Sequence, residues 1–143
     1  VPDDPEVMPI GRARIVKEGG DVTLVAWGAM THVAERAVEK AEKELKAGIE
    51  LIDLLTIAPM DTAAIVESVR KTGRCVIVQE APRTLGISSE IVARINDRAL
   101  LYLEAPVARV TGYDLVTPYF GREAAYFPSE KRITRALKET LDF

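Results

Sequence analysis

The sequence predicts an α/β fold in which a mostly parallel sheet lies between helices on both of its faces. Two observations carry this prediction. Short apolar segments alternate with amphipathic ones along the 143 residues, as crossover connections between parallel strands require. Within residues 21–28, the side chains of residues 22–27 alternate between two faces and only Thr23 among them is polar, which is typical of an inner strand that is covered on both faces.

The first two strands are expected close together in the chain. Residues 13–17 form a short strand candidate, and the turn Gly19-Gly20 separates it from the central strand at residues 21–27. This spacing favours a hairpin between the two strands.

Two helices follow with clear end signals. Residues 32–46 carry apolar side chains at four-residue intervals, which indicates a helix face against the sheet, and Gly48 is a natural stop. Asp61 is the expected N-cap of a second helix, and Gly73 is its expected end.

The second half of the chain continues the alternation. The remaining strands are expected at residues 49–54, 74–80 and 107–111. Ser88 or Ser89 is the expected cap of a third helix, and Ser129 is the expected cap of a closing helix. Residues 112–128, rich in proline and aromatic residues, are expected to form a loop.

The length and composition indicate one domain. A chain of 143 residues with 48% hydrophobic content can bury roughly two thirds of its unfolded surface. Residues 1–12 contain three prolines and are expected to be a linker segment, so the domain is expected at residues 13–143.

Charge and hydropathy exclude several classes of partner. The 19 basic and 22 acidic residues are mixed along the chain, so no concentrated positive field is available to hold nucleic acid. No apolar run reaches the roughly 18 to 20 residues that span a bilayer. We therefore expect a soluble, intracellular protein with no nucleic-acid or membrane partner.

The residues offer little chemistry of their own. His32 is the only histidine and Cys75 the only cysteine, so a zinc site lacks ligands. We interpret His32 as a surface or capping residue rather than a general base, and Cys75 as a packed, inert thiol inside an apolar strand.

Three residues near strand ends are weaker candidates. Gly28 opens a helix and could bring backbone N–H groups to an anion, but neither nucleotide-binding glycine motif occurs. Asp53 and Glu80 lie at or near strand ends, each without an identified partner. Composition and spacing thus predict a fold without an active site.

Six stretches say more when they are read together. They are Pro9-Ile-Gly-Arg-Ala, Gly20-Asp-Val-Thr-Leu-Val-Ala-Trp-Gly, Ile52-Asp-Leu-Leu-Thr-Ile-Ala-Pro-Met-Asp, Ser68-Val-Arg-Lys-Thr-Gly-Arg, Glu80-Ala-Pro-Arg-Thr and Leu103-Glu-Ala-Pro-Val-Ala-Arg-Val-Thr-Gly-Tyr-Asp. In order and spacing they resemble the carboxyl-terminal domain of the β subunit of the thiamine-diphosphate-dependent 2-oxo acid dehydrogenases.

The resemblance implies a fold. It is the transketolase carboxyl-terminal fold, a three-layer α/β/α arrangement around a five-stranded, mostly parallel sheet. The strand at residues 21–27 would be central, and the strand at residues 13–17 would run antiparallel at an edge, beside the third strand. The hairpin suggested by spacing conflicts with this implication.

The resemblance also implies a function. The family's decarboxylating component is a heterotetramer of two α and two β subunits (α2β2) that oxidatively decarboxylates a 2-oxo acid and transfers the acyl unit to lipoamide. Its thiamine diphosphate and magnesium are held by the α subunit and by the amino-terminal domain of the β subunit. No catalytic, cofactor-binding or metal residue is therefore carried over to this chain. The location implied is the cytoplasm, or the mitochondrial matrix in a eukaryote.

Two positions are implied as partner-binding residues. Glu104, the acidic residue before Ala-Pro, and the terminal carboxylate of Phe143 would receive the subunit-binding domain of the dihydrolipoyl acyltransferase, near the axis between two β subunits. The domain alone is also expected to homodimerise through apolar surface left exposed. Leu55 stands where the family usually has arginine, and pyruvate, branched-chain 2-oxo acids and acetoin remain open as substrates. A free-standing small-ligand or nucleotide-binding module is the alternative.

Overall fold

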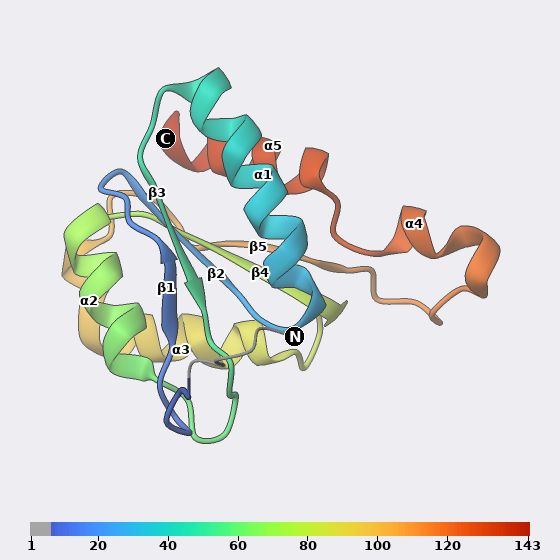
Figure 1. Ribbon diagram of the computed structural model, residues 1–143, viewed down its shortest axis with the longest axis horizontal. Helices are drawn as coiled ribbons and strands as arrows, with labels where there is room; N and C mark the ends of the chain where they lie inside the picture. Colours follow the sequence, from blue (N-terminus) through green and yellow to red (C-terminus); the bar gives the residue numbers. More distant parts are fainter. Residues whose placement is uncertain (1–6) are drawn as a thin grey trace.

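A computed structural model describes residues 7–143 as three layers, with a five-stranded sheet between two pairs of helices (Figure 1). The strands are β1 (Arg14–Lys17), β2 (Val22–Ala26), β3 (Ile49–Asp53), β4 (Cys75–Pro82) and β5 (Ala108–Gly112). Their order in the sheet is β1-β3-β2-β4-β5, so β2 is central. β2, β3, β4 and β5 pair in parallel and β1 runs antiparallel to β3 at the edge. The sheet predicted from the resemblance is confirmed.

The hairpin predicted from spacing is wrong. β1 pairs with β3, with Arg14 opposite Asp53 and Ile15 opposite Ile52. β2 cannot accept β1 as a neighbour because β3 and β4 already occupy both of its edges. The short Gly19-Gly20 turn therefore carries the chain past β3 rather than back along β1.

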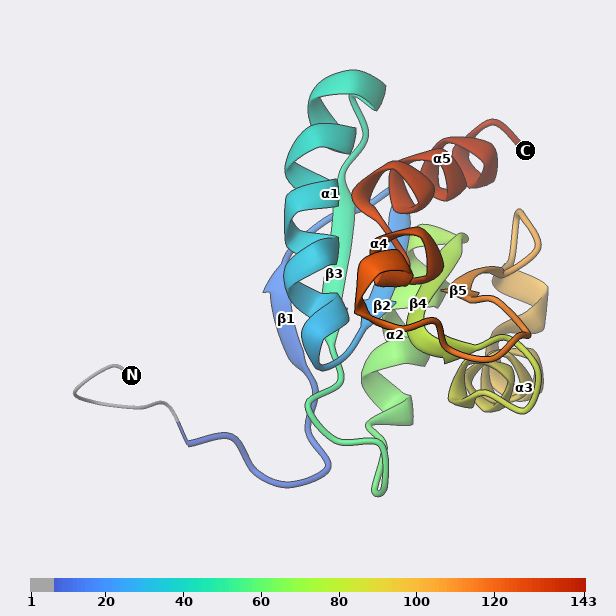
Figure 2. The same ribbon diagram turned by 90° about the vertical axis from the view of Figure 1, so that its right-hand side faces the viewer.

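Four main helices cover the sheet. They are α1 (Ala29–Leu45), α2 (Thr62–Thr72), α3 (Ile87–Ala99) and α5 (Glu130–Leu141). α1 and α5 lie on one face and α2 and α3 on the other (Figures 1 and 2). Because α1 and α3 leave neighbouring strands for opposite faces, the chain changes side between β2 and β4.

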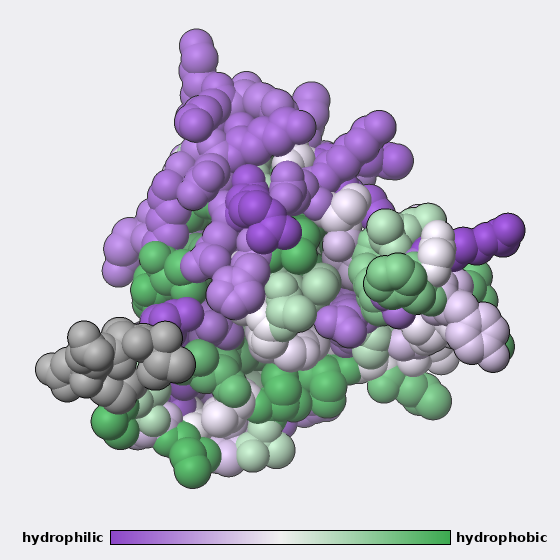
Figure 3. Space-filling view, turned by 45° about the vertical axis from the view of Figure 1, so that its right-hand side comes forward, coloured by the Kyte–Doolittle hydropathy of each residue, from purple (hydrophilic) through white to green (hydrophobic). Residues whose placement is uncertain are grey.

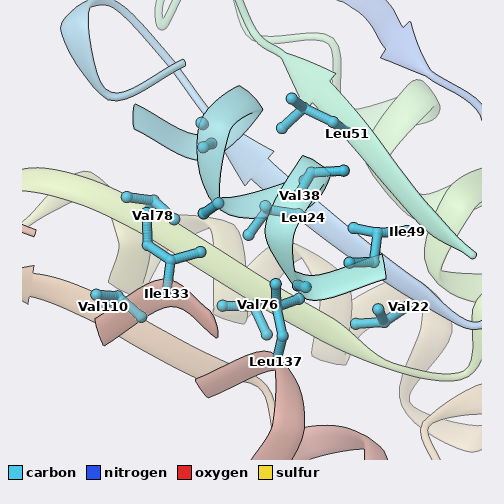
Figure 4. Close-up of a cluster of buried hydrophobic side chains, with 14 of the residues drawn as sticks. Val22, Leu24, Val38, Ile49, Leu51, Val76, Val78, Val110, Ile133 and Leu137 are labelled. Carbon is cyan, nitrogen blue, oxygen red and sulfur yellow. The ribbon is translucent and has the colours of Figure 1, made fainter. Parts of the chain in front are cut away.

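Each face of the sheet has its own apolar core. The core under α1 and α5 is shown in Figure 4, where Leu24, Val76 and Ile133 meet between the sheet and the two helices. The core on the other face joins Ile77 of β4 to Ile91 of α3 and residues of α2. β2 contributes to both cores, which confirms its prediction as a strand covered on both faces.

Helix ends follow the capping signals at some positions only. Asp61 caps α2 by accepting a hydrogen bond from the N–H of Ala64, and Gly73 ends that helix in the left-handed conformation. Ser129 caps α5 as predicted. Neither Ser88 nor Ser89 caps α3, however, because that helix begins earlier, at Ile87, with Gly86 as its N-cap. α1 ends at Leu45 before Gly48, and Lys46 takes the left-handed conformation.

The expected loop at residues 112–128 contains two short helical turns, η2 (Phe120–Arg122) and α4 (Glu123–Tyr126). This segment protrudes from the body of the molecule (Figure 1). On the face shown in Figure 3, hydrophobic residues gather on the protruding segment and on the lower part of the molecule, whereas the upper part is hydrophilic. A third short turn, η1 (Leu100–Tyr102), follows α3.

Candidate functional site

Glu104 lies at the end of the sheet where the parallel strands begin. It follows η1 in the segment that leads into β5, and its backbone N–H donates to the carbonyl of Gly73, 2.8 Å away. Its carboxylate lies 2.5 Å from Nη1 of Arg74, immediately before β4, yet the side chain stays 60% exposed. Glu104 is therefore held in place while its carboxylate still faces solvent.

Gly73 makes this arrangement possible. A β-carbon at Gly73 would lie 2.9 Å from the side chain of Glu104, and Gly73 also has a φ of 69°. A larger residue would meet both a clash and backbone strain. The turn between α2 and β4 thus has a local sequence that accommodates Glu104.

Phe143 lies beyond the end of α5, and the residue is 76% exposed. α5 follows β5 and runs back over the sheet beside α1, so it ends toward the edge at which the strands begin (Figure 1). Glu104 and Phe143, which are far apart in the sequence, thus lie at the same end of the sheet. Nothing in the hydrophobic pattern indicates this placement; it follows from the crossover topology.

His32 and Cys75 have the ordinary roles predicted for them. His32 is exposed on the first turns of α1, with Nδ1 3.1 Å from the carboxylate of Glu35. Cys75 is completely buried at the start of β4, and burial raises the pKa of its thiol to about 12. A thiol with so high a pKa carries almost no thiolate at neutral pH, so it is not a nucleophile.

Asp53 is a structural carboxylate. It is buried at the end of β3, where it accepts hydrogen bonds from the guanidinium of Arg14, at 3.2 Å, and from the N–H of Leu55, also at 3.2 Å. The sequence showed no partner for Asp53 because Arg14 reaches it only through the antiparallel pairing of β1 with β3. Leu55 itself is exposed and has a φ of 54°.

A hollow of about 510 Å³ lies at the opposite end of the sheet, at the carboxyl ends of the parallel strands. Its lining comes from the segment after β2, the end of β4, the start of α3 and the segment around α4. The lining residues are Trp27, Gln79, Glu80, Ala81, Pro82, Leu85, Gly86, Ile87, Thr117, Tyr126 and Phe127. Of the strand-end residues considered from the sequence, Glu80 reaches this hollow, and neither Gly28 nor Asp53 is part of its lining.

The hollow does not suit magnesium thiamine diphosphate. Among the described residues that line it, Glu80 is the only one with a charged side chain, so a diphosphate would find no cation there. Within residues 7–143 no group of three or more His, Cys, Asp or Glu side chains could hold a metal ion. None of the helices in the described part of the chain has the length and apolar character needed to cross a membrane.

Comparison with known families gives a clear match. The model of the family "Transketolase, C-terminal domain" matches residues 11–133, which is most of the chain. The chain belongs to the transketolase C-terminal domain family. A solved structure of a split-gene transketolase, an inactive β4 tetramer, agrees with a TM-score of 0.83 at 27% identity, covering 94% of this chain and 44% of that one.

Two curated relatives are more similar in sequence. The mitochondrial 2-oxoisovalerate dehydrogenase subunit beta of Dictyostelium discoideum is 48% identical over 134 residues, which is 94% of this chain. The pyruvate dehydrogenase E1 component subunit beta of Staphylococcus aureus (strain Mu50 / ATCC 700699) is 41% identical over all 143 residues. The chain spans 36% and 44% of the length of these two relatives, respectively. The predicted resemblance to β subunits of 2-oxo acid dehydrogenases is confirmed.

Proposed function

We propose that this chain is the carboxyl-terminal domain of the β subunit of a thiamine-diphosphate-dependent 2-oxo acid dehydrogenase. The observation that carries the proposal is the 48% and 41% identity to the β subunits of two such enzymes, over nearly the whole of this chain. The complete enzyme would oxidatively decarboxylate a 2-oxo acid and transfer the acyl unit to lipoamide. One relative is a subunit of a 2-oxoisovalerate dehydrogenase and the other of a pyruvate dehydrogenase, so their names do not select between a branched-chain 2-oxo acid and pyruvate as the substrate.

The domain supplies assembly rather than chemistry. Its buried ionisable groups are satisfied by structural partners, as Asp53 is by Arg14, and its thiol is inert. Thiamine diphosphate and magnesium would be held by the α subunit and by the amino-terminal domain of the β subunit. In the full heterotetramer this domain contacts a second β subunit, in the cytoplasm or the mitochondrial matrix.

Docking of the acyltransferase is the specific role of Glu104 and Phe143 within this proposal. Both residues are exposed at the edge where the strands begin, and Glu104 is anchored there by Gly73 and Arg74. A carboxylate with a free face accepts a bidentate guanidinium from a basic partner domain even while Arg74 contacts its other side. The charge of Arg74 weakens this attraction. Phe143, which is exposed at the same end of the sheet, is proposed as a second contact residue of the docking surface.

Calorimetry with the acyltransferase subunit-binding domain tests the docking role. Glu104→Ala is expected to weaken binding by about 2 kcal/mol, or roughly thirtyfold, because it leaves an arginine of the partner unpaired. Deletion of Phe143 is also expected to weaken binding, because it removes an exposed contact residue. Glu90→Ala is the matched control, since Glu90 is also exposed and also paired with an arginine, Arg94, but lies at the start of α3. Unchanged affinity in both test variants would show that these residues do not dock the acyltransferase.

A further inference from the structure

The hollow at the carboxyl ends of the strands lies where the fold favours a ligand site. Trp27 follows β2, and residues Gln79 to Pro82 end β4, so the hollow lies across the two strands whose helices leave for opposite faces. In open α/β sheets the crevice at such a switch point is where ligands bind. A volume of about 510 Å³ is in the usual range for small-molecule sites.

The walls of the hollow are held rigidly. The buried amide of Gln79 donates to the carbonyls of Ala81 and Pro82 and accepts from the N–H of Ser88. These bonds fix the turn that closes one side.

The other side of the hollow is tied to the same turn. The N–H and hydroxyl of Thr84 donate to the two carboxylate oxygens of Asp114, at 2.8 and 2.7 Å. Through this pair, the segment after β5 is joined to the segment after β4. The hollow is therefore pre-formed, which lowers the entropic cost of filling it.

The polar groups of the lining select the charge of a ligand. Glu80 is exposed, and the described lining contains no arginine or lysine, so a cation finds a counter-charge there and an anion does not. The buried ring of Tyr126 forms part of the aromatic wall. Trp27 and Phe127 add two further aromatic rings, whose faces attract cations.

We propose that this hollow binds a small organic cation, an amine carried on a compact apolar body. The carboxylate of Glu80 pairs with the ammonium group. Trp27, Ile87 and Phe127 cover the apolar body. The site is at the edge of the sheet opposite Glu104 and Phe143, and the proposal does not rest on the assignment of the chain to a β subunit.

Trp27 is the only tryptophan of the chain, so its fluorescence reports directly on the hollow. The chain is titrated with phenethylamine, with the neutral 2-phenylethanol and with the anionic phenylacetate, which share a phenyl body and differ in charge. Phenethylamine is expected to give a saturable change, 2-phenylethanol to bind about threefold more weakly, and phenylacetate to give no saturation. Equal responses to the amine and the carboxylate would overturn the proposal. So would the absence of saturation with the amine up to roughly tens of millimolar.

Variants locate the binding groups. Glu80→Gln is expected to weaken phenethylamine binding about threefold. Salt at about 0.5 M is expected to have a similar effect on the native chain, because the ion pair is exposed. Tyr126→Phe, which removes a hydroxyl buried away from the hollow, is expected to leave binding unchanged. Glu44→Gln, at an exposed acid near the far end of α1, is the control and is expected to change nothing. Glu80→Gln binding the amine as well as the native chain would overturn the assignment.

The same amine chemistry could come from a lysine of a partner protein. n-Butylamine, which has the length of a lysine side chain, separates the two sources. If the site is built for a small molecule, phenethylamine is expected to bind more tightly than n-butylamine, because the phenyl ring covers the aromatic wall. Tighter binding of n-butylamine would overturn the small-molecule assignment.

Discussion

Gly86 lies so close to Gln79 that a β-carbon at Gly86 would come within 2.0 Å of the side-chain nitrogen Nε2 of Gln79. Gln79 cannot move away easily, because it is buried and its amide is hydrogen-bonded to Ala81, Pro82 and Ser88. The buried amide and the missing side chain at Gly86 are therefore parts of one turn, which leads from β4 into α3.

Gly86→Ala is expected to lower the free energy of unfolding by about 2 kcal/mol. The φ of −80° at Gly86 suits alanine, so the loss comes from the clash alone. Urea denaturation measures the change. Gly121→Ala is the control, because nothing lies within 4 Å of a β-carbon there, and its effect is expected to stay within about 0.5 kcal/mol. Equal effects of the two substitutions would show that Gln79 gives way without cost.

Thr23→Val tests the hydroxyl cluster that joins β2 to α2. The Oγ1 of Thr23 lies 2.6 Å from Oγ of Ser68 and 2.8 Å from Oγ1 of Thr72, inside an otherwise apolar layer. Valine keeps the shape and removes both bonds, so stability is expected to fall by about 1 to 3 kcal/mol in thermal denaturation. Thr134→Val is the matched control: its buried hydroxyl has no partner in the described structure, and its loss is expected to leave stability unchanged or higher.

The ion pair between Glu50 of β3 and Lys71 of α2 makes stability depend on pH. Burial, the largest influence, raises the pKa of Glu50, but hydrogen bonds from Lys71 and Ser68 together with the other interactions outweigh it, so the pKa lies below 4.5. A carboxylate with a lowered pKa stabilises the fold above its unfolded pKa, and this contribution is lost as the pH falls through the folded value. The hydrogen bond to Glu50 raises the pKa of Lys71 above 10.5. The stabilisation contributed by Lys71 is present below pH 10.5 and is lost as the pH rises through the raised pKa of its ammonium group.

Glu50→Gln is expected to lower the free energy of unfolding by about 1 kcal/mol near neutral pH, a modest value because Lys71 is half exposed. The difference from the native chain is expected to shrink as the pH falls below the ordinary carboxyl range. Urea denaturation at a series of pH values measures this difference. Glu44→Gln, at an exposed acid, is expected to show neither effect. A constant difference down to acid pH would mean that the charge of Glu50 is not its source.

The isolated chain is expected to form a homodimer. Its protruding segment exposes several large apolar side chains, namely Tyr113, Leu115, Val116, Tyr119 and Phe120. Such a patch favours self-association. Sedimentation equilibrium at roughly tens of micromolar is expected to show a dimer. The double variant Val116→Lys with Phe120→Lys is expected to shift the chain toward monomer. A native chain that sediments as a monomer contradicts the prediction, and Leu101→Lys, on η1, is the control for added charge.

The sequence was most informative where neighbouring residues control the structure. The cap made by Asp61 and the left-handed end at Gly73 were predicted because both depend on a few adjacent residues. It was less reliable for α3, where the buried contact of Ser88 with Gln79, from another element, draws Ser88 into the first turn instead of the cap position. The turns η2 and α4 also escaped prediction, since they are too short to show a hydrophobic period.

The sequence by itself determined the alternation of strands and helices, the buried centre at β2 and, through its ordered motifs, the family of the chain. Only the tertiary structure decided which strand neighbours which, because hydrogen bonds between strands are long-range and the spacing of β1 and β2 favoured the wrong partner. The tertiary structure also paired Arg14 with Asp53 and Glu104 with Arg74, and it formed the hollow between Trp27 and Tyr126. Each of these arrangements joins residues from separate crossover units, whose distance in space no local pattern records.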